Sequence, residues 1–117
     1  MVQIIHNSRC SKSREAYAIL KEKAILFETI EYLKTPLSQK QITDLLKKLG
    51  LKAQEIIRKK ENLFKEKFAD KKLTELEWIK VLSENPVLIE RPIVVKDNKA
   101  VIGRPTENVI ALLEENK

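Results

Sequence analysis

The sequence predicts an α/β protein whose strands gather at the two ends of the chain, with a block of helices between them. Short apolar and β-branched runs occupy the first 33 residues and return after residue 92. Two Ser/Thr-x-x-Gln/Glu signals, which are typical of helix starts, fall between those regions. We expect a mixed sheet of order βαβ, helical insertion at about 34–88, then ββα, in a single domain over residues 1–117.

The first 33 residues indicate a strand, a helix and a second strand. Residues 2–5 form an apolar run that suits a buried strand. Residues 11–23 place Ala16 and Leu20 at helical spacing, and residues 26–33 are rich in aromatic and β-branched side chains. A helical crossover of this length makes the two strands parallel.

The first helix of the middle block carries its own start and stop signals. Ser38 with Gln41 predicts a capping box, and Gly50 is a suitable end. A further helical stretch is expected over 53–68, with an interruption near 58–62.

A second capping box is predicted from Thr74 and Glu77, and this helix runs to the Asn85-Pro86 pair. Its expected apolar face consists of Leu76, Ile79 and Leu82.

The C-terminal elements are a hairpin and a helix. Residues 93–95 and 100–102 are apolar and flank a polar connection with Asp97-Asn98 at its centre, which indicates antiparallel strands. Thr106 is expected to cap the last helix, whose apolar face is Val109, Ile110, Leu112 and Leu113.

Composition excludes several classes of protein. With 43% hydrophobic and 34% charged residues, the chain suits a folded protein rather than a disordered one. Its apolar runs fall far short of the ~20 residues needed to cross a bilayer, and residues 1–10 lack the longer apolar region and cleavage site that a signal peptide is expected to have. The single cysteine fits a reducing compartment, so we expect a cytoplasmic protein. The net charge of +6 suits nucleic acid or a small oxyanion, although most lysines alternate with glutamates and indicate solvated surface.

Cys10, the only cysteine, lies between the first expected strand and the first expected helix. Backbone N–H groups and the helix dipole there favour a thiolate, which is the nucleophilic form, and can also bind an anion. Lys12 and Arg14 add positive charge, and Ser11 and Ser13 can donate to the sulfur or to an anion. The sequence therefore indicates a nucleophile beside an oxyanion pocket.

Alternatives stay open at this point. A free cysteine often only fills space in a core, although the polar neighbours of Cys10 argue against a buried position. His6 suits a structural hydrogen bond as well as a role in tuning the thiol pKa. One cysteine and one histidine cannot fill a four-ligand zinc site.

Arg91 and Arg104 bracket the predicted hairpin, one at its entry and one at its exit. Two guanidinium groups at adjacent strand ends can converge on one oxyanion. Arg58 is a weaker candidate, because Lys59 and Lys60 beside it are typical of surface. Each arginine taken singly also fits a surface charge.

Four motifs in this order resemble one family along essentially all 117 residues: HNSRCSKSR, IIRKKE, NPVLIERPIVV and GRP. The chain resembles the arsenate reductases of the glutaredoxin-coupled type. One departure is Ser8, where the family often has proline, and serine leaves the backbone angle of that loop free.

The resemblance implies a thioredoxin-like fold with a helical insertion and a cis Arg91–Pro92 bond. It also implies site roles: Cys10 as nucleophile, His6 as a residue that keeps the thiol ionised, with Ser13 in support, and an oxyanion-binding set of Arg58, Arg91 and Arg104.

The implied reaction is reduction of arsenate to arsenite through a cysteinyl-arsenate intermediate. Because the chain has no second cysteine, an external thiol must resolve this adduct. Glutathione as co-substrate, with glutaredoxin as partner, fits the family, whereas reductases that shuttle a disulfide between their own cysteines are excluded. We expect a monomer with no bound cofactor or metal and with no nucleic-acid or membrane partner.

Two rival functions stay open. Regulators of the same fold family bind RNA polymerase and sense oxidation through a Cys-x-x-Cys pair. Ser13 occupies the second position of that pair here, which leaves only a thiol-independent binding role. The other rival is a related thiol oxidoreductase with a different physiological substrate.

Overall fold

The computed structural model describes residues 2–114, which fall into two compact units. The strand unit comprises the chain up to Thr35 and from Arg91 onward, and the helical unit comprises Pro36–Glu90. Each unit is described here by itself, and the single domain over 1–117 stays a prediction.

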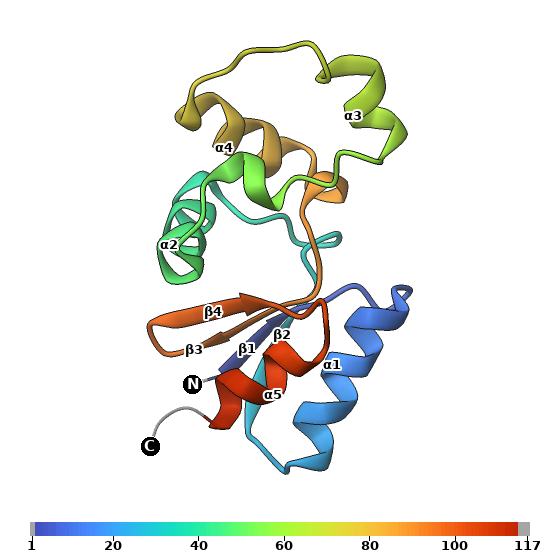
Figure 1. The fold of residues 1–117 in the computed structure, drawn as a ribbon, viewed down its shortest axis with the longest axis vertical. Coiled ribbons are helices and arrows are strands. Elements are labelled where there is room, and N and C mark those ends of the chain that lie inside the picture. The colour runs from blue at the N-terminus through green and yellow to red at the C-terminus, as the bar shows by residue number, and fades with distance from the viewer. Residues whose placement is uncertain (1, 115–117) are drawn as a thin grey trace. The chain divides into compact units, whose positions relative to one another are not determined.

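The strand unit is built on a mixed four-stranded sheet of order β2-β1-β3-β4 (Figure 1). β1 (Val2–Ile5) pairs in parallel with β2 (Phe27–Ile30) and antiparallel with β3 (Ile93–Lys96), which pairs antiparallel with β4 (Lys99–Ile102). This confirms the predicted α/β class and the parallel pair around the first crossover.

Two helices, α1 (Ser11–Glu22) and α5 (Glu107–Glu114), pack against one face of this sheet. Alternate strand residues face them, as the two-residue period of a strand requires. The resulting core contains Val2, Ile4, Ala16, Leu20, Val94, Val109 and Leu112. The predicted apolar residues of α1 and alternate apolar residues of the strands face this core, and those of α5 do so at Val109 and Leu112, whereas Ile110 is not part of it.

The second strand and the hairpin differ from expectation at their ends. β2 is shorter than the predicted 26–33, and Leu26, which precedes the first paired residue, is 82% exposed. After β2 the chain turns, since the amides of Lys34 and Thr35 donate to the Glu31 carbonyl. The hairpin loop is a two-residue turn in which Asp97 takes φ 56°, a left-handed conformation that aspartate tolerates.

The helical unit contains α2 (Gln39–Leu49), α3 (Asn62–Lys67) and α4 (Glu75–Glu84). Two 3₁₀ turns, η1 (Ala53–Ile56) and η2 (Pro86–Leu88), accompany them and were not anticipated. The break between η1 and α3 confirms the interruption predicted within 53–68.

Both predicted capping boxes are present. The Ser38 hydroxyl accepts from the Gln41 amide at 3.1 Å, and the Thr74 hydroxyl accepts from the Glu77 amide at 3.2 Å. Gly50 ends α2 at φ 71°, where a side chain would be strained.

The expected apolar face of α4 is wrong at Leu76, which is 73% exposed. The buried stripe consists of Trp78, Ile79, Val81 and Leu82. At about 100° per residue, Leu76 lies on the opposite side of the helix from the centre of that stripe.

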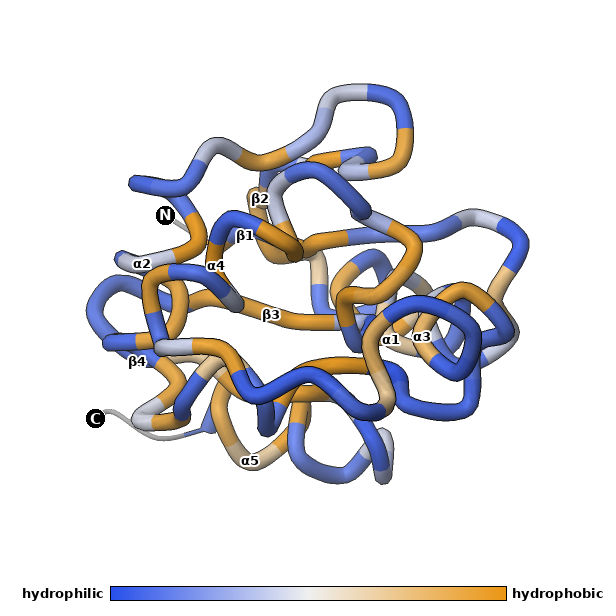
Figure 2. The backbone as a smooth tube through the Cα atoms, turned by 90° about the horizontal axis from the view of Figure 1, so that it is seen from above, coloured by the Kyte–Doolittle hydropathy of each residue, from blue (hydrophilic) through white to orange (hydrophobic). Residues whose placement is uncertain are grey.

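Figure 2 shows β3 as mostly hydrophobic, in keeping with its sequence IVVK, whereas the helices alternate between hydrophobic and hydrophilic residues. Within residues 2–114, none of the helices has the length and apolar character that crossing a membrane requires.

Candidate active site

Cys10 follows β1 and occupies the N-cap position of α1, as the sequence predicted. A tight turn presents it there, because the Cys10 amide donates to the Asn7 carbonyl at 3.0 Å. The Asn7 side-chain oxygen accepts from the Arg9 amide at 3.0 Å, a local bond typical of asparagine in turns. The thiol is only 8% exposed, so the expectation that polar neighbours would keep it out of a buried position is wrong.

The surroundings of Cys10 favour its thiolate. Burial raises the pKa of the thiol, but the Ser13 backbone N–H, the Arg91 charge, the Lys12 backbone N–H and the Arg104 charge together outweigh burial. The net pKa lies below its ordinary value. These N–H groups lie at the start of α1 and act on the sulfur as dipoles. In the described part of α1, the Cys10 side chain accepts no capping hydrogen bond.

Arg104 contacts the sulfur directly. Its Nη2 donates to Cys10 Sγ at 3.3 Å, and its Nε donates to the Arg91 carbonyl at 2.7 Å. Gly103 before it donates its amide to the Pro92 carbonyl at 2.8 Å. A Cβ at Gly103 would lie 2.9 Å from Pro92 Cγ and 3.0 Å from Val109 Cγ2, so glycine is required for this close approach.

Arg91 offers hydrogen-bond donors that the protein does not use. Its Nε and Nη1 are buried, and within residues 2–114 neither has a hydrogen-bond partner. Buried donors are normally satisfied, and two orphaned N–H groups of a cation close enough to lower the Cys10 pKa suit an anion. The Arg91–Pro92 bond is cis, as the resemblance implies, and Arg104–Pro105 is also cis, which the sequence did not indicate.

His6 directly follows β1, is buried and contacts Ser13. Its Nδ1 lies 2.6 Å from Ser13 Oγ, which also accepts from the Asn7 amide at 3.0 Å. Burial lowers the pKa of His6, and the Glu31 charge opposes this without reversing it. A neutral His6 ring can accept a hydrogen bond from the Ser13 hydroxyl. Ser13 therefore contacts His6 through its hydroxyl, whereas its backbone amide favours the Cys10 thiolate. The His6 ring also stacks on Tyr17 at 5.1 Å between centroids.

Arg58 belongs to the helical unit, between η1 and α3. Its guanidinium pairs with Glu61, and its Nε lies 3.8 Å from Glu90 Oε1. Its amide donates to the Leu88 carbonyl at 2.7 Å. The oxyanion-binding role of Arg58 stays a prediction.

Sequence reasoning missed one contact near Cys10. Thr106, expected only as a helix cap, donates its hydroxyl to Glu15 Oε1 at 2.8 Å. The same carboxylate oxygen lies 3.5 Å from Lys12 Nζ, and these contacts lower the pKa of Glu15. The two partners are 91 residues apart in the chain, and no local pattern signals such a bond.

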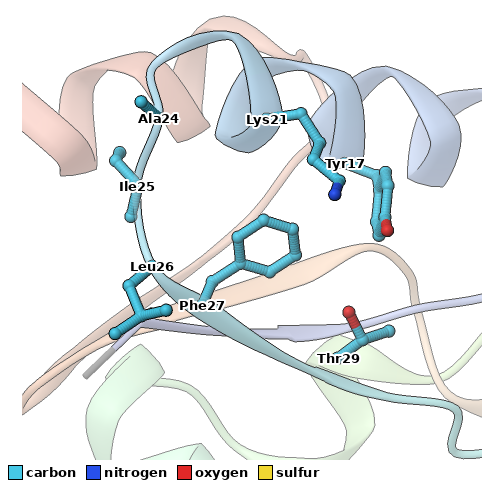
Figure 3. A pocket seen from close by; sticks show the side chains of 7 residues that line it. All are labelled: Tyr17, Lys21, Ala24, Ile25, Leu26, Phe27 and Thr29. Atoms are coloured by element: carbon cyan, nitrogen blue, oxygen red, sulfur yellow. The ribbon is translucent and has the colours of Figure 1, made fainter.

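A separate hollow of about 430 Å³ lies between α1 and β2 (Figure 3). Tyr17 and Phe27 meet edge to face there at 5.4 Å, and Lys21 Nζ lies 5.8 Å from the Tyr17 ring centre. The residues around it are Tyr17, Lys21, Ala24, Ile25, Leu26, Phe27 and Thr29. None of them is a predicted site residue. In residues 2–114, no group of three or more His, Cys, Asp or Glu side chains could hold a metal ion.

The chain is similar to known proteins over nearly all of its length. A family model described as the ArsC family matches residues 5–112. The "Uncharacterized protein YfgD" of Escherichia coli strain K12 is 48% identical over 114 residues, which cover 96% of each chain. An "Arsenate reductase" of Neisseria meningitidis serogroup A is 41% identical over 114 residues, or 96% of this chain and 97% of its own. The solved "Arsenate reductase from Vibrio cholerae" has a TM-score of 0.89 at 41% identity, and covers 94% of this chain and 95% of its own.

Proposed function

This chain belongs to the ArsC family, and we propose that it reduces arsenate to arsenite with Cys10 as the nucleophile. One observation carries the proposal. The Cys10 sulfur accepts a hydrogen bond from Arg104, while two buried donors of Arg91 have no partner among the described residues. A thiol with a lowered pKa beside unused cationic donors suits attack on an oxyanion.

In the first step the Cys10 thiolate attacks the arsenic of arsenate. A sulfur–arsenic bond forms, and an arsenic–oxygen bond breaks as the leaving hydroxide takes up a proton and departs as water. Arsenic stays at the +5 level in this cysteinyl-arsenate adduct. The unused Nε and Nη1 of Arg91 would hold the remaining arsenate oxygens, and the Arg104 guanidinium would offset charge as it builds.

In the second step the glutathione thiolate attacks the Cys10 sulfur. A sulfur–sulfur bond forms, the sulfur–arsenic bond breaks, and its electron pair stays on arsenic, which leaves as arsenite at the +3 level. The two thiols supply both electrons and end as a mixed disulfide. Glutaredoxin then returns Cys10 to the thiol by exchange. The sequence has a single cysteine, so it offers no second thiol that could resolve the adduct within the same molecule.

His6 and Ser13 would support Cys10 by holding its loop. The bond of 2.6 Å between them orients Ser13, whose amide favours the thiolate. Arg58 is proposed as a third oxyanion-binding arginine from the family resemblance. Because the reaction needs a reduced thiol, it belongs in a reducing compartment such as the cytoplasm.

The test is arsenate-dependent oxidation of NADPH with glutathione, glutaredoxin and glutathione reductase present. We expect turnover by the native chain and none by Cys10→Ser, which keeps a similar shape but loses the thiolate. The control omits arsenate, so that slow reduction of other disulfides is subtracted.

No turnover by the folded native chain, with Cys10 shown to be reduced, would contradict an arsenate reductase. Equal turnover by the native chain and by Cys10→Ser would contradict the assignment of Cys10 as the nucleophile. In the first case the next substrates to test are other oxyanions and disulfides.

A further inference from the structure

The loop that carries Arg104, residues 103–106, is attached to three parts of the strand unit. The Gly103 amide donates to the Pro92 carbonyl at 2.8 Å, which joins the loop to the entry of β3. Asn108 Nδ2 donates to the Arg104 carbonyl at 3.4 Å, which joins it to α5. The Thr106 hydroxyl donates to Glu15 at 2.8 Å, which joins it to α1, the helix that begins directly after Cys10.

The contact between Arg104 and the thiol needs such an attachment. Arg104 is exposed, and its Nη2 reaches Cys10 Sγ at 3.3 Å across two segments that are 94 residues apart in the chain. An exposed arginine side chain has considerable rotamer entropy, so it holds one geometry only when its backbone is placed accurately. The Thr106–Glu15 bond spans the same two segments as the Arg104–Cys10 contact.

We propose that Thr106 and Glu15 are positioning residues, whose hydrogen bond holds Arg104 against the sulfur of Cys10. Neither side chain needs to touch the substrate for this role. The inference rests on the proposed function only for its activity readout, because the state of the thiol is measured without arsenate.

An effect of the Glu15 charge and a positioning role of its bond to Thr106 predict opposite changes in the Cys10 pKa. Glu15 is an anion on the helix that begins directly after Cys10, so if its charge affected the thiol, neutralising it would lower the Cys10 pKa. If its bond to Thr106 positions Arg104, breaking the bond raises the Cys10 pKa, because a nearby cation is displaced. Thr106→Val breaks the bond while leaving the Glu15 charge in place, which separates the two effects.

The experiment titrates the Cys10 thiolate by its ultraviolet absorbance in four full-length chains: native, Thr106→Val, Thr106→Ser and Glu15→Gln. We expect Thr106→Val to raise the Cys10 pKa by roughly half a unit, and to lower kcat/KM for arsenate about three- to tenfold. Thr106→Ser keeps the hydroxyl and should restore the native pKa. Glu15→Gln keeps an oxygen acceptor and should not raise the pKa.

A double variant tests whether Thr106 acts through Arg104. In an Arg104→Ala background the Cys10 pKa is already raised, and Thr106→Val should add nothing further. The proposal is overturned if Thr106→Val leaves the thiol pKa unchanged, or if it raises that pKa equally with Arg104 absent. A pKa shift without arsenate turnover in any chain would support the positioning role and contradict the proposed function, so the two can fail separately.

Discussion

Replacement of Arg91 by methionine should make the free protein more stable and strongly weaken its stabilisation by arsenate. Arg91 has two buried donors without hydrogen-bond partners among residues 2–114, and each such donor costs about 1–3 kcal/mol. Methionine keeps most of the apolar stem and removes both donors. The variant loses an attraction to the Cys10 thiolate that we place at about 1 kcal/mol. With about 1.5 kcal/mol for each of the two donors, less the lost attraction, the expected net gain in the free energy of unfolding is about 2 kcal/mol.

The assay is urea unfolding followed by circular dichroism, together with a thermal scan. A gain of about 2 kcal/mol corresponds to a Tm higher by about 8 °C in a chain of this size. Arsenate at about 100 times its Kd should stabilise the native chain by about 2.7 kcal/mol, and the Arg91→Met chain by much less.

Arg104→Met is the matched control, because the Nε and Nη2 of Arg104 already donate to the Arg91 carbonyl and the Cys10 sulfur. It should destabilise the free protein or leave its stability unchanged. The reasoning is refuted if Arg91→Met lowers the free energy of unfolding by 1 kcal/mol or more, or if arsenate stabilises both chains equally.

Three further predictions concern pH, the tryptophan and a glycine. Because the folded pKa of Cys10 lies below the unfolded value of roughly 8.5, stability should rise with pH up to that value and fall as pH drops through the folded pKa. Trp78 is 2% exposed and its Nε1 has no partner among the described residues, so Trp78→Phe should cost less than about 1.5 kcal/mol and Trp78→Ala about 3–5 kcal/mol by chemical denaturation. Gly103→Ala should cost about 1–3 kcal/mol and lower kcat/KM, because its Cβ would meet Pro92 and Val109.

Each of these has its own control. Cys10→Ser should flatten the stability curve below the unfolded thiol pKa of roughly 8.5, whereas the lowered pKa of His6 affects stability only below roughly pH 6.5. A pH slope that survives Cys10→Ser would contradict the first prediction. A cost above 2 kcal/mol for Trp78→Phe would show that Nε1 has a partner. Native stability and activity in Gly103→Ala would contradict the close approach at Pro92.

Much of the fold could be predicted because its signals are local. Capping at Ser38 and Thr74 needs residues only three positions apart, and the period of a strand or helix is visible within a few residues. For the same reason the position of Cys10 between a strand and a helix start, with its access to N–H groups, was predictable. The prediction that Leu76 faces the core was wrong, because an apolar residue in a helix can fit a spacing pattern and still lie outside the buried stripe.

What the sequence by itself determined is the order of elements, the position of the thiol and the set of arginines to consider. Only the tertiary structure decided which donors are used: Arg104 donates to the sulfur, and two buried donors of Arg91 have no partner in the part of the chain that the structure describes. It also assigned the Thr106 hydroxyl to Glu15. Hydrogen bonds depend on distance and angle within tenths of an ångström, and residues that are about 90 positions apart acquire such geometry only when the chain between them has folded.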